Sequence, residues 1–434
     1  MRLSILPSMA RFLGLAVLIS LTSHPALAEG DGEAVQQPGE SIEARLDRLQ
    51  QEVEQLKKDH ATEIKALKEK LSSQQEMNSR AGTPHKSTPV GSYGGIMNPD
   101  ISAIADVQTL FTDDTDNDNR NRVLVKEVEL AFQGYLYPGI RADIIPALEM
   151  EYEGDTVDAN IDLEEAYVTA SQIPYLSEYV PLEVQAGRKF MSFGRLNPVH
   201  PHHWPFADVP LAFQNFFGEH NWLDDGIQGS ITVSNPWDLY LKPTFGVWNG
   251  KQLGHVHTAE EEEAEHDHGE PVDFDGHVFV SRTVLGMPFG RDADSLLGYS
   301  LAWDEGTNTV LHGGDLTLTY RWPGTYNRIR WQNEIYAADV RQDDYTRYGG
   351  YSLLVFTLDK YWETGIRYDR SQILDPHVDD QEWAGTGFLS YYLTHSVYLR
   401  GQYRYRHMVE DQQEHSVYLQ LVFGLGPHAH RLVD

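Results

Sequence analysis

The sequence predicts an all-β fold, a transmembrane antiparallel β-barrel of about 16 strands preceded by a short N-terminal coiled-coil helix. Three observations predict it. Residues 94–425 alternate apolar and polar side chains with a period of two. Short turns alternate with long loops through the same region. After the N-terminal segment, no run of about 18 apolar residues is long enough for a membrane-spanning helix.

The composition of the 434 residues suits a wall with one apolar face and one wet face. Aromatic residues make up 11% of the chain, yet 23% is charged, and the formal net charge is −31. This acidic balance and the lack of a basic stripe argue against a nucleic-acid partner. The chain has no cysteine. A closed barrel needs no disulfide, because every strand is paired at both edges.

Residues 1–28 have the features of a secretory signal peptide. Arg2 and Arg11 supply the positive charge, an apolar run follows at 12–21, and Ala-Leu-Ala at 26–28 is a cleavage signature. The alternative, a membrane-anchor helix, is disfavoured because the apolar run is too short to span about 30 Å of hydrocarbon. Export is therefore expected.

Residues 41–77 are predicted to form a periplasmic coiled coil, between a flexible leader at 29–40 and a linker at 78–93. Its apolar residues recur at spacings of three and four, beginning with Ile42, Leu46, Leu49, Val53 and Leu56. Such a helix is marginal alone, so we expect a homotrimer through barrel and coiled coil; a lone solvated helix is the alternative. Residues 426–434 form a C-terminal extension to the barrel at 94–425.

The barrel strands are predicted from the alternation, which is clearest near the C-terminus. The expected lipid-facing set there is Val417, Leu419, Leu421 and Phe423. Strand starts are expected near residues 100, 122, 140, 160, 181, 223, 237, 276, 294, 309, 325, 346, 360, 382, 395 and 413. A soluble β-sandwich is the alternative, but it would not need outward aromatic residues at both strand ends together with inward charges.

Tight turns are expected at 137–139, 322–324, 358–360 and 393–395. Longer excursions are expected at 111–121, 194–222, 250–275, 304–308, 339–345, 371–381 and 407–413. This alternation is typical of periplasmic turns and extracellular loops. It predicts a protein of the bacterial outer membrane, in contact with membrane lipid and lipopolysaccharide.

If the apolar alternates face lipid, the charged alternates face water inside the barrel. The predicted pore-lining residues are Glu127, Glu129, Glu149, Glu151, Arg321, Arg328, Arg330, Arg367, Arg400, Arg404 and Arg406. We expect the acids and the arginines on opposite walls, where they would produce a transverse field. The alternative is that these charges only solvate a water-filled lumen.

The loop at 194–222 is rich in Pro and aromatic residues and is therefore expected to be stiff, to fold inward and to constrict the pore. Candidate metal ligands in it are His200, His202 and His203, because imidazole with nearby carboxylates suits Zn²⁺. The alternative is that these histidines pack in the loop and bond to the backbone.

A second candidate metal segment lies at 254–268, where His255, His257, His266 and His268 flank a run of glutamates. Short His-rich tracts of this kind hold Zn²⁺ loosely; the alternative is a solvated acidic loop. No other cofactor is expected. No G-x-S-x-G, H-E-x-x-H or Walker A motif occurs, so no enzyme is predicted.

Signal peptide, coiled coil, linker and barrel together resemble the outer-membrane porins of the phosphate-selective O and P type. Residues 188–190 (Arg-Lys-Phe), within the segment 184–190, resemble that family's Gly-x-Phe strand end. Segments 193–198 and 209–213 resemble a less characterised group of barrels with His-rich loops, for which zinc-linked regulation is suggested. The resemblance implies passive diffusion of small hydrophilic solutes or ions. A second hypothesis is a zinc-gathering outer-membrane protein that uses residues 254–268.

Overall fold

The structure is a computed structural model. It describes residues 99–426 except 116, 154–155, 172, 174–179, 251–271, 273, 275, 305, 307–308, 341–344, 375–380 and 410–411. The predicted signal peptide, leader, coiled coil, linker and most of the C-terminal extension lie outside the described residues. So does the His-rich segment at 254–268. In the described part of the chain, no helix has the length and apolarity needed to cross a membrane.

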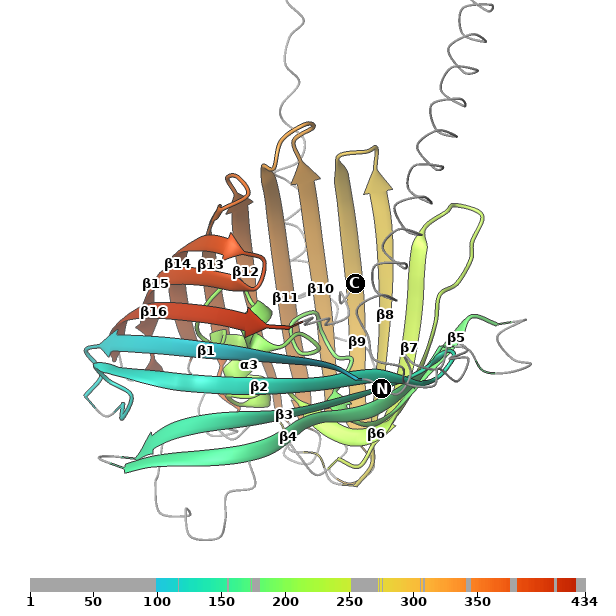
Figure 1. Cartoon of the computed structure of the whole chain (residues 1–434), viewed down its shortest axis with the longest axis horizontal. Coiled ribbons are helices and arrows are strands. Elements are labelled where there is room, and N and C mark those ends of the chain that lie inside the picture. Colours follow the sequence, from blue (N-terminus) through green and yellow to red (C-terminus); the bar gives the residue numbers. More distant parts are fainter. Residues whose placement is uncertain are drawn as a thin grey trace, which may run out of the picture. The chain divides into compact units, whose positions relative to one another are not determined.

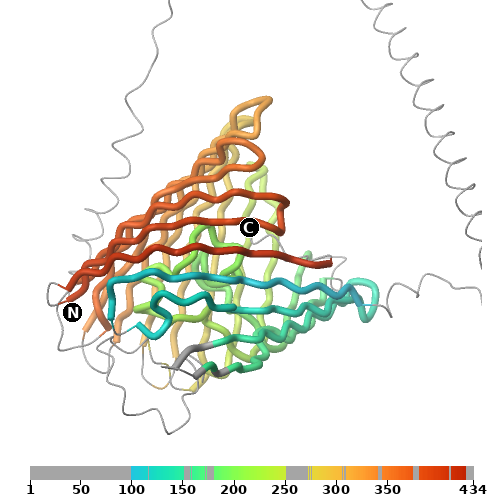
Figure 2. The backbone as a smooth tube through the Cα atoms, turned by 60° about the vertical axis from the view of Figure 1, so that its left-hand side comes forward, coloured from blue at the N-terminus to red at the C-terminus, as the bar shows by residue number. Residues whose placement is uncertain are grey.

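Sixteen antiparallel strands close into one ring (Figures 1 and 2). Their bounds are β1 (Asp100–Thr112), β2 (Arg122–Tyr137), β3 (Ile140–Glu153), β4 (Thr156–Ala170), β5 (Leu182–Phe190), β6 (Leu223–Ile231), β7 (Tyr240–Trp248), β8 (Val278–Phe289), β9 (Ala293–Asp304), β10 (Thr309–Arg321), β11 (Arg328–Val340), β12 (Tyr345–Thr357), β13 (Trp362–Gln372), β14 (Gln381–Thr394), β15 (Val397–His407) and β16 (Gln413–Leu425). Each strand pairs with its neighbours in sequence, and β1 closes the ring on β16 with Val107 opposite Leu421.

The predicted all-β fold and the strand count are confirmed, and every expected strand start lies within four residues of the observed one. The expected tight turns are also found. At the first of them, β2 passes to β3 through Pro138 and Gly139, and Gly139 has a φ of 78°, which side chains other than glycine rarely adopt.

The two faces of each strand meet different surroundings. On β16, Leu419 is 52% exposed on the outer face, whereas the next residue, Gln420, is 3% exposed on the inner face. Outward aromatic residues occupy both ends of the strands. They include Tyr137, Trp322 and Tyr361 at the turn end and Tyr348, Tyr368 and Tyr403 at the loop end. An apolar outer band between two aromatic girdles is the arrangement of an outer-membrane barrel. The protein is therefore located in the bacterial outer membrane.

The connection from β5 to β6, residues 191–222, lies inside the ring; we call it the inward segment. It contains the 3-10 helix η1 (Pro201–His203) and the helix α3 (Leu211–Phe217). Its residues bond to strands in every part of the ring, among them β1, β4, β9, β11, β13 and β15. A segment that reaches all sides of a closed ring must lie within it, and Figure 1 shows α3 enclosed by strands.

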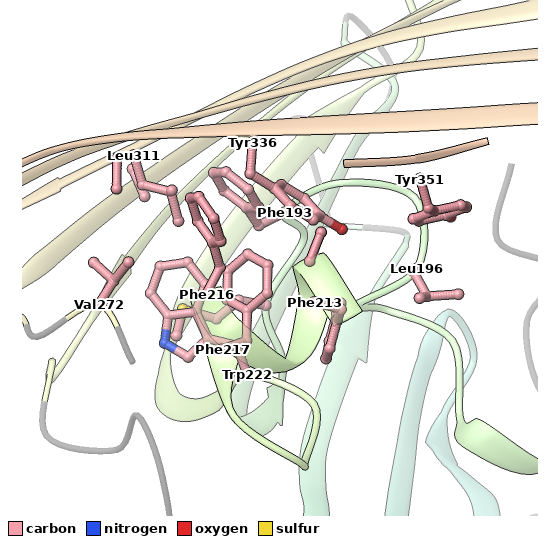
Figure 3. Packing of buried hydrophobic residues seen from close by; sticks show 14 of the residues in the cluster. Phe193, Leu196, Phe213, Phe216, Phe217, Trp222, Val272, Leu311, Tyr336 and Tyr351 are labelled. Atoms are coloured by element: carbon pink, nitrogen blue, oxygen red, sulfur yellow. The ribbon is translucent and has the colours of Figure 1, made fainter. Parts of the chain in front are cut away.

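One side of the inward segment is packed against the wall by aromatic side chains (Figure 3). Phe213, Phe216 and Phe217 of α3 are at most 2% exposed, and they pack with Tyr336 of β11 and Leu353 of β12. Each such buried side chain contributes roughly 1.5–3 kcal/mol through removal of apolar surface from water. The inward segment thereby shares an apolar core with β7–β12 and β14.

Candidate functional site

Asn197 links the two ends of the inward segment, which we call its base, through hydrogen bonds. The side-chain amide of Asn197 donates hydrogen bonds to the carbonyls of Met191 and Trp222, both at 2.9 Å, and its oxygen accepts the N–H of Trp222 at 2.6 Å. Asn221 donates in turn to the carbonyls of Asn197 and Val199. These bonds join the two ends of the segment.

The inward segment first approaches β11 at Gly194. Gly194 has a φ of 62°, and a side chain there would collide with Glu334 of β11. The carboxylate of Glu334 accepts the backbone N–H groups of Arg195 at 2.7 Å and Leu196 at 3.3 Å, and the hydroxyl of Tyr351 at 2.9 Å. Three hydrogen bonds thus converge on this one carboxyl group. Glu334 therefore anchors the start of the segment.

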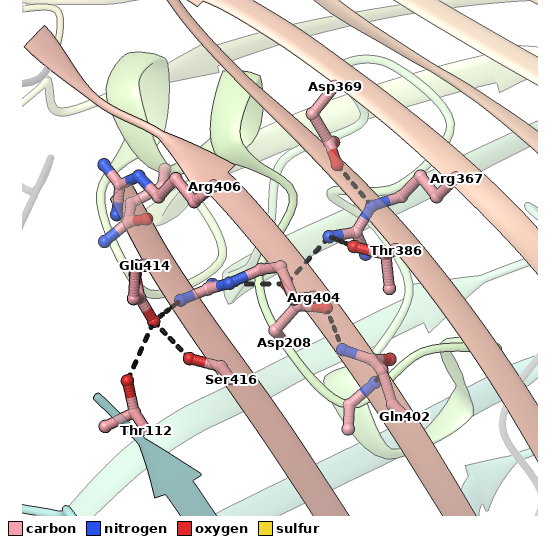
Figure 4. A network of polar contacts seen from close by, with 12 residues as sticks. Thr112, Asp208, Arg367, Asp369, Thr386, Gln402, Arg404, Arg406, Glu414 and Ser416 are labelled. Atoms are coloured by element: carbon pink, nitrogen blue, oxygen red, sulfur yellow. Dashed lines mark hydrogen bonds and ion pairs between the residues drawn. The ribbon is translucent and has the colours of Figure 1, made fainter. Parts of the chain in front are cut away.

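The tip of the segment is held by Asp208 (Figure 4). Its carboxylate accepts hydrogen bonds from Arg367 of β13 at 2.8 Å and from Gln402 and Arg404 of β15 at 2.6 and 3.3 Å. Burial alone would raise the pKa of Asp208, but Arg367 and Arg404 outweigh it and hold that pKa below its ordinary value. The adjacent carbonyl of Phe206 accepts from Arg400 at 3.0 Å.

The wall formed by β2 and β4 carries buried carboxylates, and a β-bulge concentrates them. Ile145 of β3 pairs with Glu165, whereas the next residue, Pro146, pairs with Leu163, so Glu164 is the extra residue. Proline lacks the N–H that a regular ladder needs and is typical of such irregular positions. Because of the bulge, the consecutive residues Glu164 and Glu165 both point into the barrel, and both are buried.

Two histidines of the inward segment contact this acidic wall. Nδ1 of His200 lies 3.1 Å, and Nδ1 of His202 lies 3.2 Å, from the same oxygen of Glu129. His200 also lies 3.5 Å from Glu164 and 3.3 Å from Glu165. Burial alone would lower the pKa of His200, but the carboxylates, Glu129 foremost, outweigh it and raise that pKa well above its ordinary value.

A cavity of about 530 Å³ lies between the inward segment and the strands β1–β5, β15 and β16. Its charged lining residues are Asp114, Lys126, Glu127, Glu149, Asp162, Glu164, Arg188, Asp208, Glu219, His220, Arg404, Arg406 and Glu414. Carboxylates and arginines thus face one shared space. A polar solute there would meet charges of both signs, whereas an apolar one could not replace the hydrogen bonds of water.

The predicted pore-lining residues have several different placements. Glu127, Glu129, Arg367, Arg400 and Arg406 are buried on the inner face, and Glu149, Arg328, Arg330 and Arg404 are partly buried. Arg321 is exposed at the turn end, where it pairs with Asp294. The side chain of Glu151 lies outside the described residues.

The expectation of opposite charged walls is wrong for the arginines of β15, whereas β11 lies opposite β3 in the ring. In the ring, only β1 and β16 separate β2 from β15, so the arginines of β15 lie beside the acidic wall. They are also neutralised locally: Arg404 pairs with Glu414 at 2.7 Å and Arg406 with Glu382 at 3.0 Å. Closure of the ring brings the first and last strands together, which a linear reading of the strand order overlooks.

Of the predicted metal ligands, the structure brings His200 and His202 together with Glu129. His203 is exposed, and its ring lies 4.4 Å from that of His202 without joining the cluster. His255, His257, His266 and His268 lie outside the described residues. Glu164 and Glu334 were not among the predicted site residues. For Glu164 a signal was present, because the outward alternation of Ile161 and Leu163 changes phase after residue 164.

Comparisons with known proteins agree with this architecture. No protein-family model matches the chain. An uncharacterised protein of Aquifex aeolicus (strain VF5) is 27% identical over 254 residues, which are 52% of this chain and 50% of that protein. The match therefore spans about half of that relative's length.

Among solved structures, the anion-selective porin from Comamonas acidovorans has a TM-score of 0.50 at 12% identity, with 75% of this chain and 99% of that chain covered. OmpF of Salmonella typhi, solved in complex with daunomycin, has a TM-score of 0.49 at 8% identity, with 75% and 97% covered. At such identities the likeness to the Comamonas porin concerns the fold. The chain thus has the closed 16-strand barrel fold of a bacterial outer-membrane porin.

Proposed function

We propose that this protein is a passive outer-membrane channel for small hydrophilic solutes or ions, in which the inward segment forms the constriction. The proposal rests on one observation: this segment is tethered across the lumen and leaves a cavity of about 530 Å³ lined by charges of both signs. A volume of this order suits a small solute rather than a polymer.

The path favoured by this geometry runs along β1–β5, β15 and β16. Apolar and aromatic side chains pack the inward segment against β7–β12 and β14. On the open side, carboxylates such as Glu127 and Glu149 face the same space as Arg404 and Arg406. Charges of opposite sign across a narrow aqueous space orient dipolar solutes and exclude apolar ones. The function is therefore one of selective diffusion.

Although the sequence resembles phosphate-selective porins, we do not propose phosphate as the solute. The cavity is lined by eight carboxylates, but by only four lysine and arginine side chains. An excess of carboxylates disfavours a multiply charged anion by Coulomb repulsion. We expect neutral polar solutes and cations to pass more readily than phosphate.

The constriction is tested by shortening the segment without disturbing its base. Replacing residues 199–209 with a short Gly-Ser linker leaves Asn197 and Asn221 in place to close the loop. Single-channel conductance in planar bilayers should rise, and liposome swelling should admit larger sugars than the unaltered chain admits. A linker of equal length in place of 254–264 is the matched control. Unchanged conductance and an unchanged size limit would contradict the proposed constriction.

We further propose a homotrimer, supported by the heptad-like apolar spacing at 42–71. Light scattering in detergent on the mature chain should give three times the protomer mass. The same measurement on a chain that begins at residue 94 separates the contribution of the coiled coil from that of the barrel. A monomer in both cases would contradict the trimer.

Zinc gathering is the second candidate function, and the observation that favours it is the pair of His-x-His motifs at 255–257 and 266–268. Under zinc starvation, a host strain in which these four histidines are replaced by Asn should grow more slowly than the strain with the unaltered chain. Growth that is equal in both strains would leave diffusion as the function of the barrel.

A further inference from the structure

Two histidines of the inward segment and two glutamates of the barrel wall bring their ligand atoms to one place in the lumen. The same Oε2 atom of Glu129 lies 3.1 Å from Nδ1 of His200 and 3.2 Å from Nδ1 of His202. Oε2 of Glu164, from the bulge of β4, lies 3.5 Å from Nδ1 of His200. All four residues are at most 9% exposed, and His202 and Glu129 are at most 1%.

We propose that this cluster is a binding site for one divalent transition-metal ion of the Zn²⁺ type, with Nδ1 of His200, Nδ1 of His202 and the carboxylates of Glu129 and Glu164 as its ligands. Two imidazoles and two carboxylates form a donor set that suits zinc and its neighbours in the periodic table. Calcium and magnesium prefer oxygen ligands alone, so the two imidazoles disfavour them.

The spacing of the ligand atoms supports the proposal. Zinc binds imidazole nitrogen and carboxylate oxygen at about 2.1 Å, so two ligands of a tetrahedral site lie about 3.4 Å apart. The distance from Oε2 of Glu129 is 3.1 Å to Nδ1 of His200 and 3.2 Å to Nδ1 of His202, and Oε2 of Glu164 lies 3.5 Å from Nδ1 of His200. An ion can therefore be accommodated with little movement of the side chains.

The second shell also has the form found around metal-bound histidine. Nε2 of His200 lies 3.3 Å from Glu165, whose carboxylate also accepts the backbone N–H of Phe190 at 3.2 Å. A histidine that binds metal through one nitrogen usually donates its other N–H to a carboxylate, which fixes the orientation of the ring. The bulge supplies both carboxylates, Glu164 for the ion and Glu165 for the histidine.

A fifth residue, Glu127, adds a third buried carboxyl group to the cluster. Glu127, Glu129 and Glu164 bring carboxylate oxygens within 4.8 Å of one another, and all three are buried. Oε1 of Glu127 accepts no hydrogen bond from any residue in the described part of the chain. Buried carboxylates at this spacing repel one another unless a cation or protons neutralise them. A protonated His200 brings one positive charge, and a divalent ion brings two.

The proposed ion would join the inward segment to β2 and β4. The Asp208 network ties the tip of the segment to β13 and β15, on the other side of the ring closure. The ion would therefore complete the attachment of the segment around the cavity, as a structural staple rather than as a catalytic centre. This role is independent of the solute that the channel carries.

The test uses the full mature chain folded in detergent, with His255, His257, His266 and His268 replaced by Asn so that the His-rich segment contributes no zinc. Zinc content after dialysis against Zn²⁺ is measured by mass spectrometry, and affinity by competition with a chromogenic chelator. His202→Asn and Glu129→Gln are the site variants. The matched control is His203→Asn, because His203 is an exposed neighbour outside the cluster.

We expect one zinc ion per chain in this background and in His203→Asn, and a loss of affinity on the order of tenfold or more in either site variant. No bound zinc in a folded background chain, or equal affinity in all variants, would overturn the proposal. If both site variants fail to fold, the proposal is tested by adding Co²⁺ to the background chain and recording its absorption spectrum. Absorption bands of tetrahedral Co²⁺ that Zn²⁺ abolishes support the site, and their absence overturns it.

Discussion

Asp208 and Arg367 are 159 positions apart in the sequence, yet their side chains form a buried ion pair at 2.8 Å. The guanidinium of Arg367 lies on β13 and also bonds to Asp369 at 2.8 Å, and it lies over the ring of Phe206 at 4.3 Å. A charge in this position is stable only while its partners remain, because burial without them is costly. This pair therefore ties the inward segment to the wall.

The first prediction concerns Asp208→Asn. The amide keeps the size of the carboxylate but removes the negative charge that faces Arg367 and Arg404, so two buried cations lose a partner. We expect a loss of about 3–5 kcal/mol in the free energy of unfolding, measured by urea titration in lipid vesicles. Asp225→Asn breaks the half-exposed pair with Arg188 and serves as control. It should cost at most about 1 kcal/mol, and equal losses in the two variants would contradict the anchoring role.

The second prediction concerns acid. The pKa of Asp208 is lowered in the folded protein, so the unfolded chain binds a proton at this residue more readily than the folded one. The stabilisation is fully present above the ordinary Asp pKa of about 3.9 and is lost as the pH falls through the lowered value. Unfolding free energy measured from pH 7 down to pH 2 should show an acid-dependent loss in the unaltered chain. Asp208→Asn should reduce that loss, and an identical profile would contradict the assignment.

The third prediction concerns Glu334. In Glu334→Gln, one acceptor oxygen becomes an NH₂ group that faces the backbone N–H of Arg195 or Leu196. A buried N–H without an acceptor costs about 1–3 kcal/mol, so the start of the inward segment should detach more often. Single-channel records should show more frequent transitions between conductance levels. Tyr351→Phe removes only one of the bonds to Glu334 and should have a smaller effect. Single-channel records of Glu334→Gln without additional conductance transitions would contradict the prediction.

The fourth prediction concerns charge selection. Replacing Arg400, Arg404 and Arg406 together by Gln keeps hydrogen-bonding capacity but removes three positive charges from the lumen. Their partners Glu414 and Glu382 then each lose a compensating positive charge. The ratio of cation to anion permeability, measured from reversal potentials in a salt gradient, should rise.

The control for this selectivity test is Arg321→Gln, because Arg321 is exposed at the turn end and pairs with Asp294 there. It removes one positive charge outside the cavity, against three in the lumen variant, so the two shifts are compared per charge removed. A shift as large as that of the lumen variants would show that net charge, and not position in the cavity, governs selection.

The strand pattern could be read from the sequence because it depends on local alternation. Leu419 is apolar and Gln420 is polar, and these identities alone predict which side meets hydrocarbon and which meets water. The tight turns follow from the local chemistry of residues such as Pro138 and Gly139. The bulge at Glu164, which was not predicted, appears in the sequence as a change of phase.

The candidate site was predicted only in part. The stiff composition of 194–222 indicated an inward loop, and His200 and His202 were recognised as candidate ligands. Their partner Glu129 was predicted to line the pore, but nothing in the sequence indicated that it meets these histidines. Likewise Glu334, which anchors the segment, resembles any other inward carboxylate.

The sequence by itself determined the approximate number of strands and, outside irregularities such as the bulge at Glu164, the side that each residue faces, because a strand alternates regardless of its distant neighbours. The tertiary structure alone decided which charges meet. Ring closure places β15 near β2, and the inward segment brings Asp208 to Arg367 and His200 to Glu129. Such pairings depend on the path of one loop through three-dimensional space, and a period of two residues carries no information about that path.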